Sequence, residues 1–108
     1  MNSQHDSIIN DYFDRIKAKL PVSDLFATDA TIISHKFGKL SPQQYDEKLQ
    51  VQDGISTIEV TLNRAIQEDD VVVVYLEFVF NSVTNRRYVD VFQFKHEKIL
   101  NLYLNRLT

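Results

Sequence analysis

The second half of this chain is a succession of β-rich runs joined only by short polar links. From Ile55 onward the chain reads as strand, and between Ile58 and Ile66 apolar residues alternate with polar ones. Such alternation is typical of a strand with one buried and one solvated face. Because strands joined by short links pair as antiparallel neighbours, these runs predict an antiparallel meander.

The later runs predict three more strands. Val71–Phe80 follows a polar turn at residues 67–70 and is apolar on both faces except for Glu77, which indicates a central or doubly covered strand. Residues 81–87 read as a polar connection. The last two runs flank the polar turn Lys95–Lys98, which predicts a hairpin over residues 88–107.

The first half of the chain has helical spacing instead. Apolar residues recur three and four apart through residues 8–20, which predicts an amphipathic helix. Pro21 should end this helix near residue 19 or 20. Residues 22–29 are expected to form a short second helical turn, with Leu25 and Phe26 directed inward.

One more strand and one more helix are expected before the meander. Residues 30–37 are rich in β-branched side chains and predict a strand. Ser41, Pro42 and Gln44 match the start of a helix, with serine at the cap, proline at the first position and glutamine three residues on. Tyr45 would lie on the apolar face of this short helix.

Helices followed by a meander indicate a single α+β domain over residues 1–108, with the helices on one face of a curved sheet. The net charge of −3 favours neither a nucleic-acid backbone nor an anionic membrane surface. No apolar run approaches the ~20 residues of a membrane span. We therefore expect no nucleic-acid partner and no membrane association.

The residue types needed for many cofactor sites are absent or badly spaced. The chain has no cysteine, which excludes disulfides, thiol nucleophiles and thiolate metal sites. His5 is expected in a frayed terminus and His96 in the hairpin turn, so the three histidines show no metal spacing. The N-terminus lacks the basic and apolar regions of a signal peptide. We expect a cytoplasmic protein without a metal or another cofactor.

Two segments carry a resemblance to a known family. The run Leu25–Thr31 reads LFATDAT and leads into a strand, and the run Val89–Phe94 reads VDVFQF in the meander. In this order of elements, the chain resembles the NTF2-like superfamily over nearly its whole length, in its SnoaL-like and ketosteroid-isomerase-like branch. The resemblance implies a cystatin-like cone, in which a curved antiparallel sheet wraps around the N-terminal helix and leaves an apolar cavity open at one end.

The resemblance also implies candidate catalytic residues. Tyr12 and Asp90 match the tyrosine and the acid that form the oxyanion hole of ketosteroid isomerases. The position of the isomerase base, at the end of the run Asp29–Ser34, holds Ser34, which has no useful basicity near neutral pH. His35 follows and titrates in the right range, but strand alternation turns it to the opposite face unless a bulge intervenes.

Asp90 has two interpretations that the residues leave open. Strand alternation places it among aromatic side chains, where burial would raise its pKa and let the neutral acid donate a hydrogen bond to a ligand. Alternatively, Asp90 accepts hydrogen bonds from Tyr12 or from backbone groups and anchors the first helix to the sheet. In the first case the cavity would be lined by Phe13, Ser34, Phe78, Tyr88, Phe92 and Phe94.

Two functions remain open, and with them the question of whether the chain is an enzyme. In the first, the cone binds a small apolar molecule, with isomerase- or cyclase-like proton transfer as the chemistry it could support. In the second, bulky side chains fill the cone and the domain is a non-catalytic association module. The outward face of the strand around Tyr75 and Glu77 is unusually apolar. Because members of the superfamily often dimerise through the outer sheet face, a homodimer is expected there.

Overall fold

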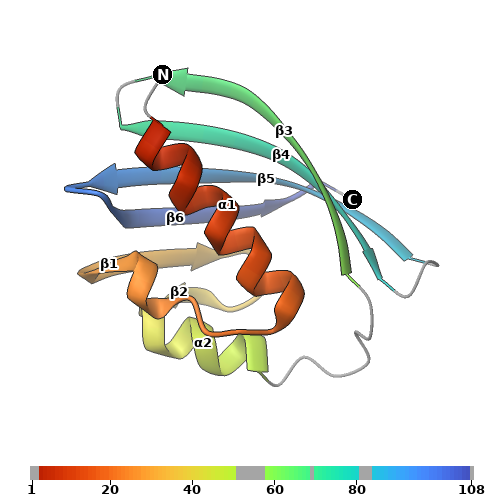
Figure 1. The fold of residues 1–108 in the computed structure, drawn as a ribbon. Coiled ribbons are helices and arrows are strands. Elements are labelled where there is room, and N and C mark those ends of the chain that lie inside the picture. The colour runs from red at the N-terminus through yellow and green to blue at the C-terminus, as the bar shows by residue number, and fades with distance from the viewer. Residues whose placement is uncertain (1–2, 51–57, 69, 81–83, 108) are drawn as a thin grey trace.

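The computed structural model of the 108-residue chain describes residues 3–50, 58–68, 70–80 and 84–107. Helices and strands follow one another in the order expected for an α+β domain (Figure 1). The elements are α1 (Ser3–Ala18), the 3-10 turn η1 (Ser23–Leu25), β1 (Phe26–Ser34), β2 (Gly38–Leu40), α2 (Pro42–Gln50), β3 (Ile58–Glu68), β4 (Val71–Phe80), β5 (Thr84–Lys95) and β6 (Lys98–Arg106).

The strands form one curved sheet in the order β2-β1-β6-β5-β4-β3. Strands β3 to β6 form the predicted antiparallel meander. The sheet differs from the expected all-antiparallel arrangement at one place, because β1 lies parallel to β6. These two strands are separated by most of the chain, so no hairpin imposes an antiparallel direction on them. The predicted α+β architecture, in which a curved sheet packs against the N-terminal helix, is confirmed.

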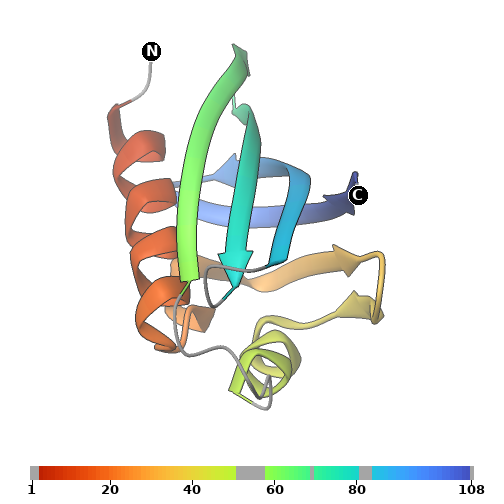
Figure 2. The same ribbon diagram turned by 90° about the vertical axis from the view of Figure 1, so that its right-hand side faces the viewer.

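Helix α1 lies across one face of the sheet, and α2 lies at the edge formed by β1 and β2 (Figure 2). Side chains alternate along the strands, so that Val72, Val74 and Leu76 of β4 are buried whereas Tyr75 is exposed. The helix contributes its apolar side chains to the same layer. The core comprises Ile9, Tyr12, Phe13, Val22, Phe26, Ala30, Ile32, Leu40, Tyr45, Val72, Val74, Leu76, Phe92, Phe94, Ile99 and Leu102.

The segment after α1 is less helical than predicted. Pro21 follows the end of α1, as expected, but only η1 is helical within residues 22–29. The chain enters β1 at Phe26 because this residue pairs with Ile99 of β6, which draws the backbone into the sheet. Leu25 and Phe26 do pack inward, as predicted.

The predicted strand over residues 30–37 ends earlier, at Ser34. The hydroxyl of Ser34 accepts hydrogen bonds from the amides of Lys36 and Phe37, at 3.1 and 3.2 Å, and these bonds turn the chain toward β2. The polar connection predicted for residues 81–87 was also wrong in part. Residues 81–83 lie outside the described residues, but residues 84–87 belong to β5 and pair with β4. Pairing with a neighbouring strand overrides polar composition there.

Two local predictions are confirmed in detail. The amide of Ser41 donates to the side chain of Gln44 at 2.9 Å, and the amide of Gln44 donates to the hydroxyl of Ser41 at 3.2 Å, which is a capping box. His96 and Glu97 join β5 to β6 with φ angles of 51° and 63°. Two positive φ values in a two-residue hairpin loop are typical of a type I′ turn.

No helix among the described residues is long and apolar enough to cross a membrane.

Candidate functional site

Asp90 lies on the inner face of β5, where only 3% of its surface is exposed. Burial raises the pKa of this carboxyl group well above its usual value, because the charged form loses its hydration. Among the described residues, Oδ1 of Asp90 has no hydrogen-bond partner. The buried environment therefore favours a neutral acid with unused hydrogen-bonding capacity.

Two tyrosines from different helices meet in the same part of the core. The hydroxyl oxygens of Tyr12 on α1 and Tyr45 on α2 lie 2.5 Å apart and share a hydrogen bond. Burial raises the pKa of both phenols, and the proximity of Asp90 raises it further. The ring of Tyr12 contacts Phe92, which lies two residues from Asp90 on the same face of β5, and the charge of Asp90 acts on both phenols. We therefore treat Tyr12, Tyr45 and Asp90 as one group, the tyrosine–acid cluster.

The cluster is rich in donors. Each tyrosine carries one O–H group, and the protonated form of Asp90 carries a third. Within the described part of the chain, the hydrogen bonds among these groups amount to the one between the two phenols. An oxygen atom that accepts hydrogen bonds is therefore the chemical group that the cluster is best suited to hold.

Aromatic rings surround the cluster. The ring of Tyr12 makes edge-to-face contacts with Phe13, Phe26 and Phe92, at centroid distances of 4.9, 6.4 and 5.4 Å. Phe26 in turn packs edge-to-face on Tyr45. These rings exclude water, so a hydrogen bond made by the cluster is electrostatically stronger than one made at the surface.

The predicted cavity residues take different positions. Phe13, Phe92 and Phe94 are buried in the core, and Tyr88 is partly buried and packs against it. The side chain of Phe78 lies outside the described residues.

Ser34 and His35 are the two residues considered for the position of the isomerase base. Register places Ser34 on the inner face in the row of Asp90, with Leu104 between them, but its hydroxyl is bound to the amides of the following turn. His35 is exposed in that turn and is not part of the buried cluster, because the strand ends before a bulge can redirect it.

The prediction of a frayed N-terminus around His5 was wrong. His5 is 3% exposed, and its ring stacks on Phe94 at a centroid distance of 4.1 Å. Its Nε2 lies 3.9 Å from a carboxylate oxygen of Asp70 in the turn before β4. The stack holds the first turn of α1 against the sheet.

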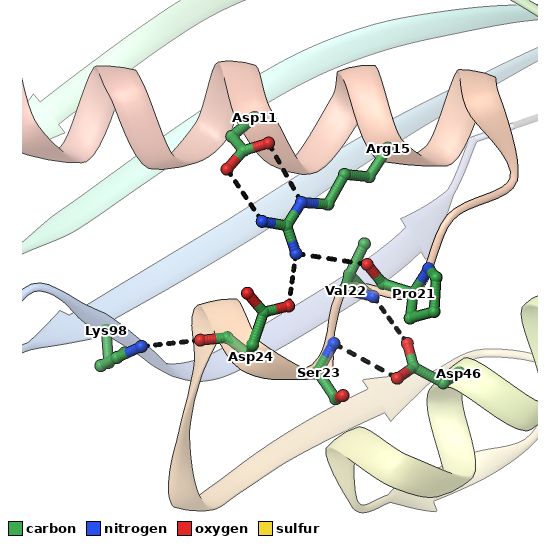
Figure 3. Close-up of polar contacts among 8 residues, drawn as sticks. All are labelled: Asp11, Arg15, Pro21, Val22, Ser23, Asp24, Asp46 and Lys98. Atoms are coloured by element: carbon green, nitrogen blue, oxygen red, sulfur yellow. Dashed lines mark hydrogen bonds and ion pairs between the residues drawn. The ribbon is translucent and has the colours of Figure 1, made fainter.

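A separate polar network fixes the helices that carry the two tyrosines (Figure 3). Arg15 of α1 donates to both oxygens of Asp11, to the carbonyl of Pro21 and to Asp24. Asp46 of α2 accepts hydrogen bonds from the amides of residues 22 and 23, at 2.8 and 3.3 Å. Because Asp46 follows Tyr45 directly, this contact sets the position of that phenol.

Lys98 of β6 completes this arrangement by donating to the carbonyl of Asp24 at 2.7 Å. The contacts tie α1, α2 and β6 to the chain segment between Pro21 and Asp24. We call this set the connector network; it comprises Asp11, Arg15, Asp24, Asp46 and Lys98.

Tyr45 is the cluster residue that the sequence did not reveal. Its position on the apolar face of a short helix predicted burial but gave no partner for its hydroxyl. A buried tyrosine hydroxyl needs a hydrogen-bond partner, and that requirement was the available signal. No group of three histidine, aspartate or glutamate side chains among the described residues could hold a metal ion.

No protein-family model matches this chain, and no curated protein matches it in sequence. Solved structures do resemble it. A protein of Jannaschia sp. CCS1, provisionally named a SnoaL-like polyketide cyclase, is 17% identical with a TM-score of 0.76, covering 96% of this chain and 85% of its own. A protein of Kribbella flavida, provisionally named a ketosteroid isomerase, is 14% identical with a TM-score of 0.80, covering 98% and 79%.

An NTF2-like protein of unknown function from Burkholderia xenovorans LB400 is 12% identical with a TM-score of 0.80, covering 96% of this chain and 83% of its own. These likenesses show that the domain has the NTF2-like fold, in the form shared by SnoaL-like and ketosteroid-isomerase-like proteins. At such low identity they show the fold alone, since one fold supports many unrelated activities.

Proposed function

We propose that this domain binds a small, largely apolar molecule inside the cone and orients it through one oxygen atom held by the tyrosine–acid cluster. The observation that carries the proposal is the buried Oδ1 of Asp90, which has no partner among the described residues and lies in the core that also buries the two phenols. A carbonyl or hydroxyl oxygen of the ligand would accept the hydrogen bonds that the cluster has to give.

The energetics favour this interpretation. A buried polar atom without a partner costs about 1–3 kcal/mol, whereas the whole domain is expected to be stable by only about 5–15 kcal/mol. An apolar side chain at position 90 would avoid that cost in a core that is otherwise aromatic. A ligand that supplies the missing acceptor offsets it.

The tyrosine–acid cluster can bind and polarise a ligand oxygen, but it does not by itself complete a proton-transfer reaction. Isomerase- or cyclase-like proton transfer needs a general base. The position that the resemblance assigns to a base holds Ser34, and His35 is exposed. The chemistry supported by the cluster is therefore binding and polarisation of a carbonyl group, and proton transfer would require a base beyond these two residues.

Binding of two simple probes tests the proposal. 2-Naphthol presents a two-ring apolar body with one oxygen, and naphthalene presents the same body without it. We expect calorimetry or fluorescence to show 2-naphthol binding at least about tenfold more tightly, which corresponds to about 1.4 kcal/mol. Tyr12→Phe should reduce this preference, because it removes one donor.

Tyr75→Phe provides the matched control, because Tyr75 is 45% exposed on the other face of the sheet. This variant should retain the wild-type preference. Equal affinity for the two probes, or no binding of either, would contradict the proposal.

A second proposal concerns association of two copies. The outer face of the sheet exposes Tyr75 and Ile33, at 45% and 42% of their surfaces. Ile33 lies in a row with Tyr103, Val91 and Val73 across four strands. We propose that a second copy covers this face.

Charge favours a two-fold arrangement. Glu77 lies opposite Arg87 in the sheet, beside the exposed apolar residues. In a two-fold interface, Glu77 of one copy can contact Arg87 of the other copy, and Arg87 of the first can contact Glu77 of the second. The two opposite charges would then form two equivalent ion pairs. Sedimentation should detect a dimer that Tyr75→Lys dissociates; a monomer at all concentrations would contradict this proposal.

A further inference from the structure

Two arginines share the inner face of the sheet with Asp90. Residues 86, 88 and 90 of β5 project to the same side, because strand side chains alternate and the pairing with β4 has no irregularity there. Arg106 of β6 lies opposite Tyr88, two residues beyond Leu104, which packs against the core. Both arginines therefore lie on the face that carries the tyrosine–acid cluster.

Along the strands, the inner face changes from exposed and positively charged to buried. Arg106 is exposed and Arg86 is half-buried, Tyr88 packs against the core, and Asp90 is buried. The arginines lie where β5 begins and β6 ends, at the end of the sheet opposite the β5–β6 hairpin (Figure 1). A molecule that reached Asp90 along this face would pass a cationic rim and then the ring of Tyr88.

The arginines do not serve to neutralise Asp90. Burial is the cause of the raised pKa of Asp90, and no described guanidinium group lowers it. Each guanidinium carries five N–H donors in a planar fork, so an arginine that makes a contact within the protein keeps donors for another partner.

We propose that the ligand of this domain carries a carboxylate at the end remote from its acceptor oxygen, bound by Arg86 and Arg106. This inference rests on the proposed function of the tyrosine–acid cluster. Two independent observations converge on it: the cationic pair on the inner face, and the unpartnered, buried carboxyl oxygen of Asp90 deeper on the same face. The ligand class is thus an amphipathic acid with a polar oxygen at its apolar end.

The spacing suits a ligand of about two fused rings. The diagonal neighbours Asp90 and Arg106 lie roughly 7–8 Å apart. The Cα atoms of Asp90 and Arg86 are about 14 Å apart, at ~3.4 Å per residue along the strand. Flexible arginine side chains cover the difference between these two lengths.

Comparison of 2-naphthol with 6-hydroxy-2-naphthoic acid tests the inference, since the second probe adds a carboxylate at the far end of the same body. We expect the carboxylate to improve the dissociation constant by about tenfold or more at low salt, and raised ionic strength to reduce that gain. Binding of 2-naphthol should not depend on salt.

Three single variants locate the effect. Arg86→Gln and Arg106→Gln should each remove most of the gain from the carboxylate and leave 2-naphthol binding unchanged. Arg87→Gln is the matched control, because Arg87 has the same charge on the same strand but lies on the opposite face. It should leave the gain intact.

The outcomes separate the two proposals. If neither probe binds, the proposed function fails and this inference fails with it. If 2-naphthol binds and the carboxylate adds nothing, or if Arg87→Gln removes the gain as strongly as Arg106→Gln, this inference alone is overturned. Should Arg86→Gln destabilise the fold, the exposed Arg106 still gives a decisive result, and Arg86→Lys retains the charge.

Discussion

The connector network and the tyrosine–acid cluster both join helices of this domain, but they differ in how their polar groups are satisfied. In the connector network, Arg15 and Asp46 each bind two or more groups. In the cluster, three polar side chains are buried, yet Oδ1 of Asp90 has no partner among the described residues. The first pattern is typical of a structural contact, and the second is the observation on which the proposed ligand site rests.

The two regions also shift the pKa values of their acids in opposite directions. Hydrogen bonding from Arg15 lowers the pKa of Asp24, whereas burial raises that of Asp90. The network thus stabilises a charged carboxylate and the cluster disfavours one. Four substitutions test this contrast.

Asp46→Ala should have the largest effect. It removes the acceptor of two backbone amides, at residues 22 and 23, and should lower the free energy of unfolding by about 2 kcal/mol. Urea denaturation measures this loss. Glu47→Ala, at the exposed neighbouring residue, should change stability by less than about 0.5 kcal/mol. If Asp46→Ala and Glu47→Ala lowered the free energy of unfolding equally, the connector network would not have the structural role assigned to it.

Tyr45→Phe should have a smaller effect on stability and a larger one on binding. It removes the hydrogen bond to Tyr12, which contributes about 0.5–1.5 kcal/mol to the free energy of unfolding. We also expect weaker binding of 2-naphthol, because the phenol of Tyr12 loses the group that orients it. Unchanged binding would place Tyr45 outside the ligand site.

Asp90→Asn should change stability by less than about 1 kcal/mol near pH 4, because an amide resembles the neutral acid in shape. Its effect is on pH dependence. In the wild type the folded pKa lies above the unfolded value of about 3.9, so stability present at low pH is lost as pH rises toward the folded pKa.

The variant should lack this loss and become the more stable protein at alkaline pH. Thermal melts from pH 4 to pH 9 measure the difference. A variant that unfolds at every pH would instead identify Asp90 as an ionised structural anchor.

Asp24→Asn should have the smallest effect and the opposite sign. The folded pKa of Asp24 lies below the unfolded value, so its contribution is present above about pH 3.9 and lost as pH falls through the folded pKa. Asp24 is largely exposed, and solvent screens its pairing with Arg15. Thermal melts between pH 2 and pH 6 should show that the melting temperature of the variant falls slightly less steeply as pH is lowered. A steeper fall for the variant would contradict a folded pKa of Asp24 below the unfolded value.

The parts of the fold that depend on neighbours in sequence were predictable. Strand β4 has the predicted bounds, and the capping box of α2 and the β5–β6 hairpin follow from residues within a few positions of one another. Local periodicity and turn chemistry carry this information. The same alternation placed Asp90 on the inner face with Phe92.

The parts that depend on distant contacts were not predictable. Phe26 became a strand residue because it pairs with Ile99, and Tyr45 joined the site through Tyr12, which lies 33 residues away. His5 was expected to fray and is buried because Phe94 offers a ring for it to stack on. In each case a partner that is far away in sequence overrode the local signal.

The parallel pairing of β1 with β6 has a consequence for biosynthesis. Strand β6 lies between β1 and β5, so the segment from β1 to α2 cannot join the sheet until the last strand has left the ribosome. Until then β1 presents an unpaired edge, and edges of that kind recruit other chains. A ribosome-associated factor that shields β1 would therefore be expected to raise the yield of this protein more than it raises that of a simple meander.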